Sequence, residues 1–80
     1  MAKGKELVIF SRRLKSALYA RGMNGKQLAL AIGVSQPTVS HYVTGQEYPR
    51  LISLPAICQA LNVSADYLLG LTNKMEVLKK

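Results

Sequence analysis

Helix-capping side chains and helix-ending glycines recur along this sequence and divide it into short segments. Ser, Asn and Asp side chains bond the free amides at the start of a helix, whereas glycine accepts the left-handed conformation that commonly ends one. Strand patterns are weak, and no linker is long enough to separate two domains. We therefore predict one all-α domain with five helices, over about 7–20, 25–32, 36–44, 52–61 and 65–69.

The second and third helices have the clearest start signals. Asn24 is a good N-cap, and Gln27 follows it at the spacing of a capping box. Ser35 caps the third helix, and Pro37 lies in its first turn, where a missing amide hydrogen costs nothing. The glycine turn AIGV, residues 31–34, joins the two helices. This arrangement suggests a helix-turn-helix, whose second helix lies in the major groove of DNA.

Apolar spacing supports the first helix, while the start of the fourth is open. The first helix places four apolar side chains on one stripe: Phe10, Leu14, Ala17 and Leu18. The fourth helix begins at Ile52 or at Leu54, because Ser53 and Pro55 offer a competing cap and first turn. The tail, residues 71–80, adds one turn of helix or stays mobile.

The charge of the chain is strongly positive and unevenly placed. Eleven Lys and Arg residues outweigh four acidic residues, for a net charge of +7. No acidic residue lies between Leu7 and Gln46, a stretch that contains Arg12, Arg13 and Lys26. Such a one-signed segment favours an anionic partner, either a nucleic acid or a membrane surface. The alternative is that the charge serves solubility alone.

Cysteine usage and apolar runs bear on location and chemistry. Cys58 is the single cysteine, so no internal disulfide forms, and we predict a reducing compartment and a buried thiol. The apolar run LVIF, residues 7–10, is too short for a signal-peptide core or a membrane span. We therefore expect a cytoplasmic protein without membrane contact. One His, one Cys and no paired carboxylates favour neither catalysis nor a metal site, and we expect no cofactor or small-molecule substrate.

The third helix has a polar face without formal charge. A helical wheel at about 100° per residue separates this face from Val39, Tyr42 and Val43. Its members are Gln36, Pro37, Ser40, His41 and Thr44. An ordinary solvated face usually carries Lys and Glu, whereas short neutral groups bind well only where a pattern of base edges matches them. Gln bonds adenine through two hydrogen bonds, Ser serves any base, Pro touches a thymine methyl, and His donates to guanine.

From Phe10 to Gly70 the chain resembles the lambda-repressor-like helix-turn-helix family of phage repressors, Cro proteins and bacterial regulators. The matching segments are RRLKSALYARGMNGKQLALAIGVSQPTVSHYVTG and YPRLISLPAICQALNVSADYLLG. The resemblance implies a compact five-helix domain whose second and third helices form the helix-turn-helix. It also implies base contacts by Gln36, Pro37, Ser40 and His41, and a phosphate contact by Thr44.

The chain departs from the family pattern at two places. Many members have Gln at the position of Gly25, so the phosphate contact of that Gln is lost here or is supplied by Lys26. Many members also join the first and third helices with an Arg–Glu ion pair. The matching positions are Leu18 and Val43, and we expect an apolar contact between them, which need not be weaker.

Three segments follow from these patterns: a basic N-terminal arm (1–6), a helix-turn-helix DNA-binding domain (7–70) and a C-terminal tail (71–80) with a possible dimer contact. The predicted phosphate contacts are Lys3, Lys5, Arg13, Lys26, Thr44 and Arg50. The predicted dimer contacts are Leu69, Leu71 and Val77.

The sequence therefore predicts a transcriptional regulator, taken to be a repressor from a phage or prophage, rather than an enzyme. It would bind a near-palindromic double-stranded operator as a homodimer. The alternative is an antitoxin or another protein-interaction module with the same fold, which the apolar residues of the C-terminal part would serve. A controller of restriction–modification genes is a further option among DNA-binding proteins.

Overall fold

The computed structural model describes the backbone of residues 5–76 and the side chains of residues 8–76. Five helices form over this part of the chain: α1 (Lys5–Ala20), α2 (Gly25–Ile32), α3 (Gln36–Val43), α4 (Ser53–Leu61) and α5 (Ala65–Leu68). The predicted all-α fold and its five helices are confirmed. The predicted contacts of Lys3, Lys5 and Val77 depend on side chains outside the described residues. The end of the predicted arm, residues 5 and 6, belongs to α1.

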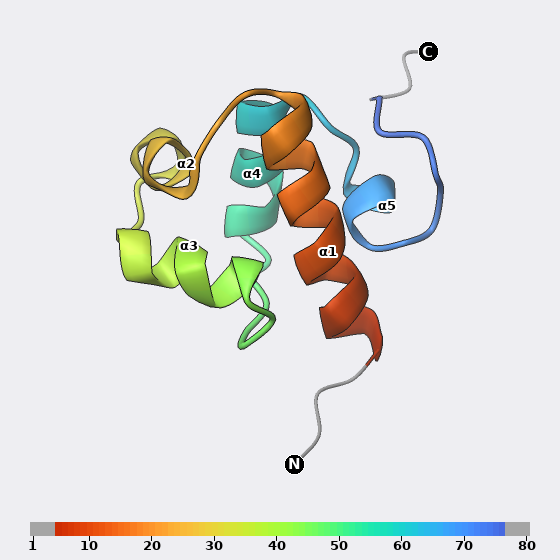
Figure 1. Ribbon diagram of the computed structural model, residues 1–80, viewed down its shortest axis with the longest axis horizontal. Helices are drawn as coiled ribbons and strands as arrows, with labels where there is room; N and C mark the ends of the chain where they lie inside the picture. The colour runs from red at the N-terminus through yellow and green to blue at the C-terminus, as the bar shows by residue number, and fades with distance from the viewer. Residues whose placement is uncertain (1–4, 77–80) are drawn as a thin grey trace.

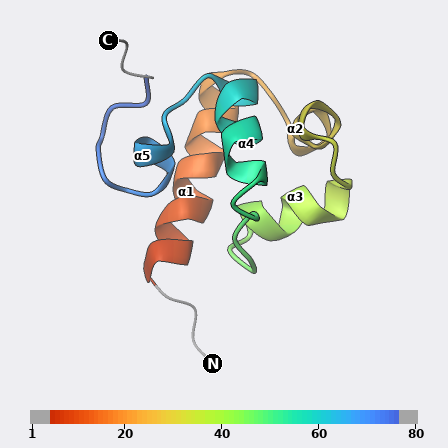
Figure 2. The same ribbon diagram turned by 180° about the vertical axis from the view of Figure 1, so that it is seen from behind.

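α1 stands at the centre of the domain, between α3 on one side and α5 on the other (Figure 1). The view from behind shows the same order (Figure 2). α2 contacts both α3 and α4, so these three helices and α1 enclose one core. The short α5 closes the core on the side of α1 that faces away from α3.

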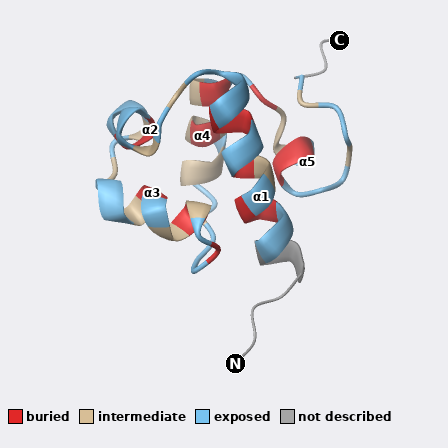
Figure 3. Ribbon diagram, in the orientation of Figure 1, coloured by how far each residue is buried: buried red, intermediate tan, exposed pale blue. Residues whose placement is uncertain are grey.

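The buried residues form one cluster to which every helix contributes (Figure 3). The predicted stripe of α1 is confirmed, because Phe10, Leu14 and Ala17 are fully buried and Leu18 is 8% exposed. The other members of the cluster are Leu28, Ala29, Val39, Tyr42, Ile57, Leu61, Val63, Tyr67 and Leu68. Burying one such apolar side chain contributes about 1.5–3 kcal/mol, so the cluster fixes where α3 lies.

Local signals at the helix starts form as predicted. The Gln27 amide donates to Asn24 Oδ1 at 2.8 Å, and Gln27 Oε1 accepts from the Asn24 amide at 2.9 Å, which completes the capping box. Ser35 Oγ accepts from the Thr38 amide at 3.3 Å. α4 is different: Ile52 is its N-cap and provides no side-chain bond. The open question of its start is thus settled at Ser53.

Two predictions outside the helix-turn-helix need correction. Residues 71–76 form no helical turn; Met75 packs against the core, and its carbonyl accepts from the Ser64 amide at 2.9 Å. Cys58 is half-buried rather than buried, since it lies on the α4 surface that faces the tail. Burial still raises the pKa of its thiol, so the thiolate is disfavoured.

Candidate nucleic-acid interface

α2 and α3 are joined by a tight turn that glycine makes possible. Gly33 has φ of 75°, a left-handed conformation, and both its amide and the Val34 amide bond to the Ala29 carbonyl. A side chain with a Cβ is disfavoured in this conformation by roughly 1–2 kcal/mol. A Cβ at Gly25, by contrast, would sit 3.5 Å from Val39 Cγ1, which is ordinary contact. α2 therefore begins close against the middle of α3.

The structure divides α3 into the two predicted faces. Val39 is fully buried and Tyr42 is 3% exposed, so one face belongs to the core. On the opposite face Gln36, Pro37, Ser40 and Thr44 are exposed, and His41 is partly exposed. Figure 3 shows the start of α3 as open surface at the edge of the domain. The candidate base contacts thus share one accessible surface, and their contact with DNA stays a prediction.

The hydroxyl of Thr44 is engaged within α3. Its Oγ1 donates to the Ser40 carbonyl at 2.8 Å and accepts from Gln46 Nε2 at 3.1 Å. A phosphate oxygen needs a donor, and the one hydroxyl proton of Thr44 is already committed in this arrangement. Gln46 is exposed and carries a second amide proton. Gln46 was not among the contacts predicted from the sequence, although it is a neutral polar residue just after the same helix.

The C-terminal end of α3 is held in one position relative to α1. Gly45 has φ of 78°, and the Gln46 amide donates to the His41 carbonyl at 2.9 Å. Together with the bond from the Gly45 amide to the Tyr42 carbonyl, this is a Schellman ending. Ser11 Oγ donates to the Val43 carbonyl at 2.6 Å. Ser11 is 9% exposed, so this is a buried tie between α1 and α3.

The Ser11 bond bears on the predicted Leu18–Val43 contact. Ser11 lies seven residues before Leu18, or two helical turns, which is about 10.5 Å along α1. Leu18 belongs to the core cluster, and Val43 packs against that cluster. The direct contact of their side chains stays a prediction. Ser11 was identifiable from the sequence only by its place on the apolar stripe of α1.

His41 and Glu47 form a side-chain hydrogen bond beside the exposed face. His41 Nδ1 lies 3.0 Å from Glu47 Oε1, and the two side chains are 45% and 52% exposed. Glu47 follows the Schellman ending directly, which returns the chain toward His41. The sequence analysis assigned no role to Glu47.

Two of the predicted phosphate contacts flank α3. Lys26 is exposed in the first turn of α2, the helix that packs against α3. Arg50 is exposed in the loop after α3. Burial raises the pKa of Tyr42, Glu47 raises it further, and the nearby Arg50 guanidinium opposes this effect. Arg50 therefore lies within electrostatic range of the C-terminal end of α3.

The Arg13 guanidinium lies on the side of α1 away from α3, so the structure gives no support to its predicted phosphate contact. Its guanidinium donates to the Thr72 carbonyl at 2.9 Å and to Asn73 Oδ1 at 3.0 Å, and it stacks 4.4 Å from the centre of the Tyr67 ring. These partners belong to α5 and the tail, on the side of α1 away from α3 (Figures 1 and 2). Arg21 is committed in a similar way, through Nε to the Leu61 carbonyl at 2.7 Å.

A protein-family model described as helix-turn-helix matches residues 14–68, which is more than half of the chain. The chain belongs to this family of DNA-binding transcriptional regulators. The predicted lambda-repressor-like family is thereby confirmed, and its members are regulators rather than enzymes.

Individual helix-turn-helix relatives agree with this assignment. The chain is 31% identical over 65 residues to the uncharacterized HTH-type transcriptional regulator YobD of Bacillus subtilis (strain 168). The match covers 81% of this chain and 58% of that relative.

Two solved structures are similar in fold. LexA, the SOS-response transcriptional repressor of Eubacterium rectale, has a TM-score of 0.79 at 29% identity, with 86% of this chain and 73% of that chain covered. The restriction-modification controller protein C.AhdI of Aeromonas hydrophila has a TM-score of 0.75 at 26% identity, with 81% and 98% covered.

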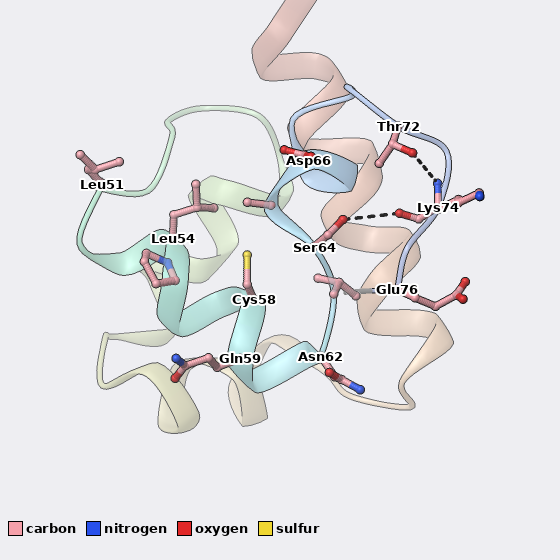
Figure 4. A pocket seen from close by; sticks show the side chains of 13 residues that line it. Leu51, Leu54, Cys58, Gln59, Asn62, Ser64, Asp66, Thr72, Lys74 and Glu76 are labelled. Carbon is pink, nitrogen blue, oxygen red and sulfur yellow. Dashed lines mark hydrogen bonds between the residues drawn. The ribbon is translucent and has the colours of Figure 1, made fainter. Parts of the chain in front are cut away.

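The helix-turn-helix domain also exposes apolar side chains near α4 and α5. Leu69 and Leu71, two predicted dimer contacts, are 40% and 74% exposed. Leu51 and Ile52, which the sequence analysis left out, are 84% and 82% exposed. Leu51 lies at the entrance of a groove of about 700 Å³ between α4, α5 and the tail (Figure 4). Leu51 and Leu69 line one pocket together. We refer to these four exposed residues, Leu51, Ile52, Leu69 and Leu71, as the second surface.

Two further observations concern the described residues. No helix among them is long and apolar enough to cross a membrane. Over the same part of the chain, His, Cys, Asp and Glu side chains form no group of three that could hold a metal ion.

Proposed function

We propose that this regulator binds a specific, near-palindromic DNA operator as a homodimer and represses transcription there. One observation carries the proposal: α3 exposes a set of neutral hydrogen-bonding side chains, while cationic residues stand at its flanks. Charge at the flanks would hold phosphates, and neutral groups in the middle would discriminate bases. LexA, one of the proteins with a similar structure, is a transcriptional repressor, which supports repression.

Gln36 is the residue on which we place most of the base discrimination. It is the first residue of α3 and is exposed, and the N-terminal end of this helix points at base edges in helix-turn-helix complexes. Its amide fits adenine with two hydrogen bonds, which contribute about 1–3 kcal/mol against a wrong base. Pro37, Ser40 and His41 would contact the neighbouring bases from the same face.

Phosphate contacts would come from Lys26, Arg50 and the Thr44–Gln46 pair. In the described structure Thr44 keeps its proton within α3, so we assign the donor role to the Gln46 amide. Lys3 of the proposed N-terminal arm remains a candidate for wrapping the duplex, and Lys5, at the start of α1, remains a candidate phosphate contact. Residues 7–70 would form the binding domain in this scheme.

The dimer would use the second surface, with Leu51 and Ile52 added to Leu69, Leu71 and Val77. Exposed leucines at 74–84% are costly in water, and their burial against a second copy would remove that cost. Two α3 helices would then enter successive major grooves about 34 Å apart. Footprints that show single, isolated half-sites at every protein concentration would contradict the dimer.

The experiment that tests the proposal is selection of binding sites from random duplex DNA, followed by the variant Gln36→Ala. We expect the variant to lose about 5- to 150-fold in affinity for the selected site, the equivalent of about 1–3 kcal/mol. Affinity for a scrambled duplex at the same salt concentration should not change. Equal losses on both duplexes would show that Gln36 only positions the helix.

The second candidate function is an antitoxin or a related protein-interaction module. The exposed Leu51 and Ile52 and the neighbouring groove favour it, because they offer an apolar surface away from α3. A toxin-like reading frame beside the gene would support this candidate. If the protein selects a specific DNA site, an antitoxin function could only be an additional role.

A further inference from the structure

The hydrogen bond between His41 and Glu47 orients the His41 ring at the exposed face of α3. We propose that Glu47 fixes the tautomer of the His41 ring, so that His41 presents Nε2 to DNA as a hydrogen-bond acceptor. The base facing His41 would then be one with an exocyclic amine in the major groove, adenine or cytosine. This inference rests on the proposed function and makes Glu47 a positioning residue for base discrimination.

The backbone holds Glu47 close to His41. The Gln46 amide donates to the His41 carbonyl at 2.9 Å, and the Glu47 amide lies 3.4 Å from the same oxygen. Both bonds depend on the left-handed turn at Gly45. The His41 carbonyl accepts these backbone bonds, so the Glu47 carboxylate lies beside the His41 ring. His41 Nδ1 and Glu47 Oε1 are 3.0 Å apart.

The chemistry of the pair decides which ring nitrogen carries hydrogen. An ionised carboxylate only accepts hydrogen bonds, so the nitrogen that faces it must be the donor. A neutral His41 ring with hydrogen on Nδ1 has a lone pair on Nε2. That nitrogen can accept from adenine N6 or cytosine N4 but cannot bond guanine N7 or O6, which are acceptors. The pair thus reverses the expectation that His41 donates to guanine.

The position of Glu47 also needs an explanation on charge grounds. It is the only acidic residue between Leu7 and Ala65, and it lies at the end of the helix proposed to contact DNA. A carboxylate near phosphates is repelled, which reduces affinity. The hydrogen bond to His41 Nδ1 holds the carboxylate in place, and the nearby Arg50 guanidinium offsets part of that repulsion. An exposed side-chain pair of this kind stabilises a fold very little, so its value lies in orientation rather than in stability.

The first test concerns the free protein and needs no DNA. His41 is the only histidine in the chain, so the imidazole nitrogen signals in a ¹⁵N NMR spectrum are unambiguous. The spectrum is recorded at pH 8, above the range in which imidazole rings ordinarily take up a proton. We expect hydrogen on Nδ1 in the unaltered protein and a mixture of both tautomers in Glu47→Gln, because an amide both donates and accepts.

The matched control is Glu76→Gln, which makes the same change at another exposed glutamate, on the tail. It should leave the tautomer of His41 unchanged. Comparable thermal unfolding of both variants would show that neither change affects the fold. Hydrogen on Nε2 in the unaltered protein, or identical spectra for the unaltered protein and Glu47→Gln, would overturn the proposal.

The second test is site selection from random duplexes at pH 8 with the unaltered protein and both variants. We expect adenine or cytosine at one position in the unaltered protein, and a loss of about 2- to 10-fold in that preference for Glu47→Gln. Preference at the position of Gln36 should persist. If Glu47→Gln selects the same base preferences as the unaltered protein, the proposed role of Glu47 is overturned while the proposed function stands. Failure to select any site would overturn the proposed function, and the base preference with it.

Discussion

The two sides of α1 use positive charge differently. On the recognition side, which we define as residues 25–50, Lys26 and Arg50 are exposed beside α3. On the rear side, residues 61–76, the Arg13 guanidinium is bonded to a carbonyl group of the tail and stacks on Tyr67 of α5, and the Arg21 guanidinium is bonded to a carbonyl group of α4. The rear side therefore uses arginine as a structural donor, while the recognition side leaves its cations at the surface.

This contrast shows why net charge does not locate a binding surface. A charge of +7 indicates a polyanionic partner, but the fold decides which cations remain available to it. A guanidinium has five donors in a fixed fork, so it can join distant carbonyls as readily as it binds phosphate. Arg13 was predicted as a phosphate contact from its place in a stretch without acidic residues, but its guanidinium lies on the side of α1 away from α3.

The largest effect should come from placing a charge in the core that both sides share. Leu18→Arg buries a charge at a position that is 8% exposed, and we expect a loss of about 3–5 kcal/mol in the free energy of unfolding. Adding Val43→Glu should recover much of that loss, because the long Arg side chain can reach the end of α3. Urea denaturation of the two single variants and the double variant measures the coupling. Additive losses would place the two positions out of contact.

The next effect should separate the rear side from the recognition side. Arg13→Ala removes two hydrogen bonds from a charged donor and the stacking on Tyr67, so we expect a loss of about 1–3 kcal/mol in stability. For Arg13→Ala, the slope of log affinity for DNA against log salt concentration should equal that of the unaltered protein. Arg12→Ala is the control, since it removes the same charge from an exposed neighbour. A smaller salt slope for Arg13→Ala alone would return Arg13 to the phosphate contacts.

The smallest effect should appear only in DNA binding. Lys26→Ala should reduce the magnitude of the salt slope by about 0.9, as expected for the loss of one phosphate contact, and weaken all sequences alike. Unfolding should be unaffected, because Lys26 is exposed. Lys74→Ala on the rear side provides the comparison and should leave the slope unchanged. Equal slopes for both variants would remove Lys26 from the interface.

Features that depend on neighbouring residues were predictable from the sequence. The capping box of Asn24 and Gln27 joins residues three apart, and the polar face of α3 follows from helical geometry over eight residues. The start of α4 was not settled in advance, because Ile52 provides no side-chain cap and only tertiary packing selects the first turn. Short-range chemistry therefore accounts for most of the fold and for the exposed surface of the candidate site.

Contacts between distant residues were not predictable in this way. The bond from Ser11 to Val43 spans 32 residues, and the bond from Arg13 to Thr72 spans 59. Each depends on how α1 lies between its neighbours, which no local pattern records. Glu47 stands six residues from His41, yet its pairing requires the left-handed turn at Gly45. Gly45 predicted where α3 ends, but it did not predict that the turn would place the Glu47 side chain beside His41.

The bonds of Arg13 to the tail have a consequence for the timing of folding. A helix forms within about a microsecond, whereas a ribosome adds about 5–20 residues per second. Thr72 lies 59 residues after Arg13, so the partner of this guanidinium is synthesised about 3–12 s later. Throughout that interval Thr72 does not yet exist, so one flank of the first helix is uncovered in the nascent chain. The helix-turn-helix segment has already been translated by then, so a ribosome-bound chain carries its recognition helix before its first helix is covered.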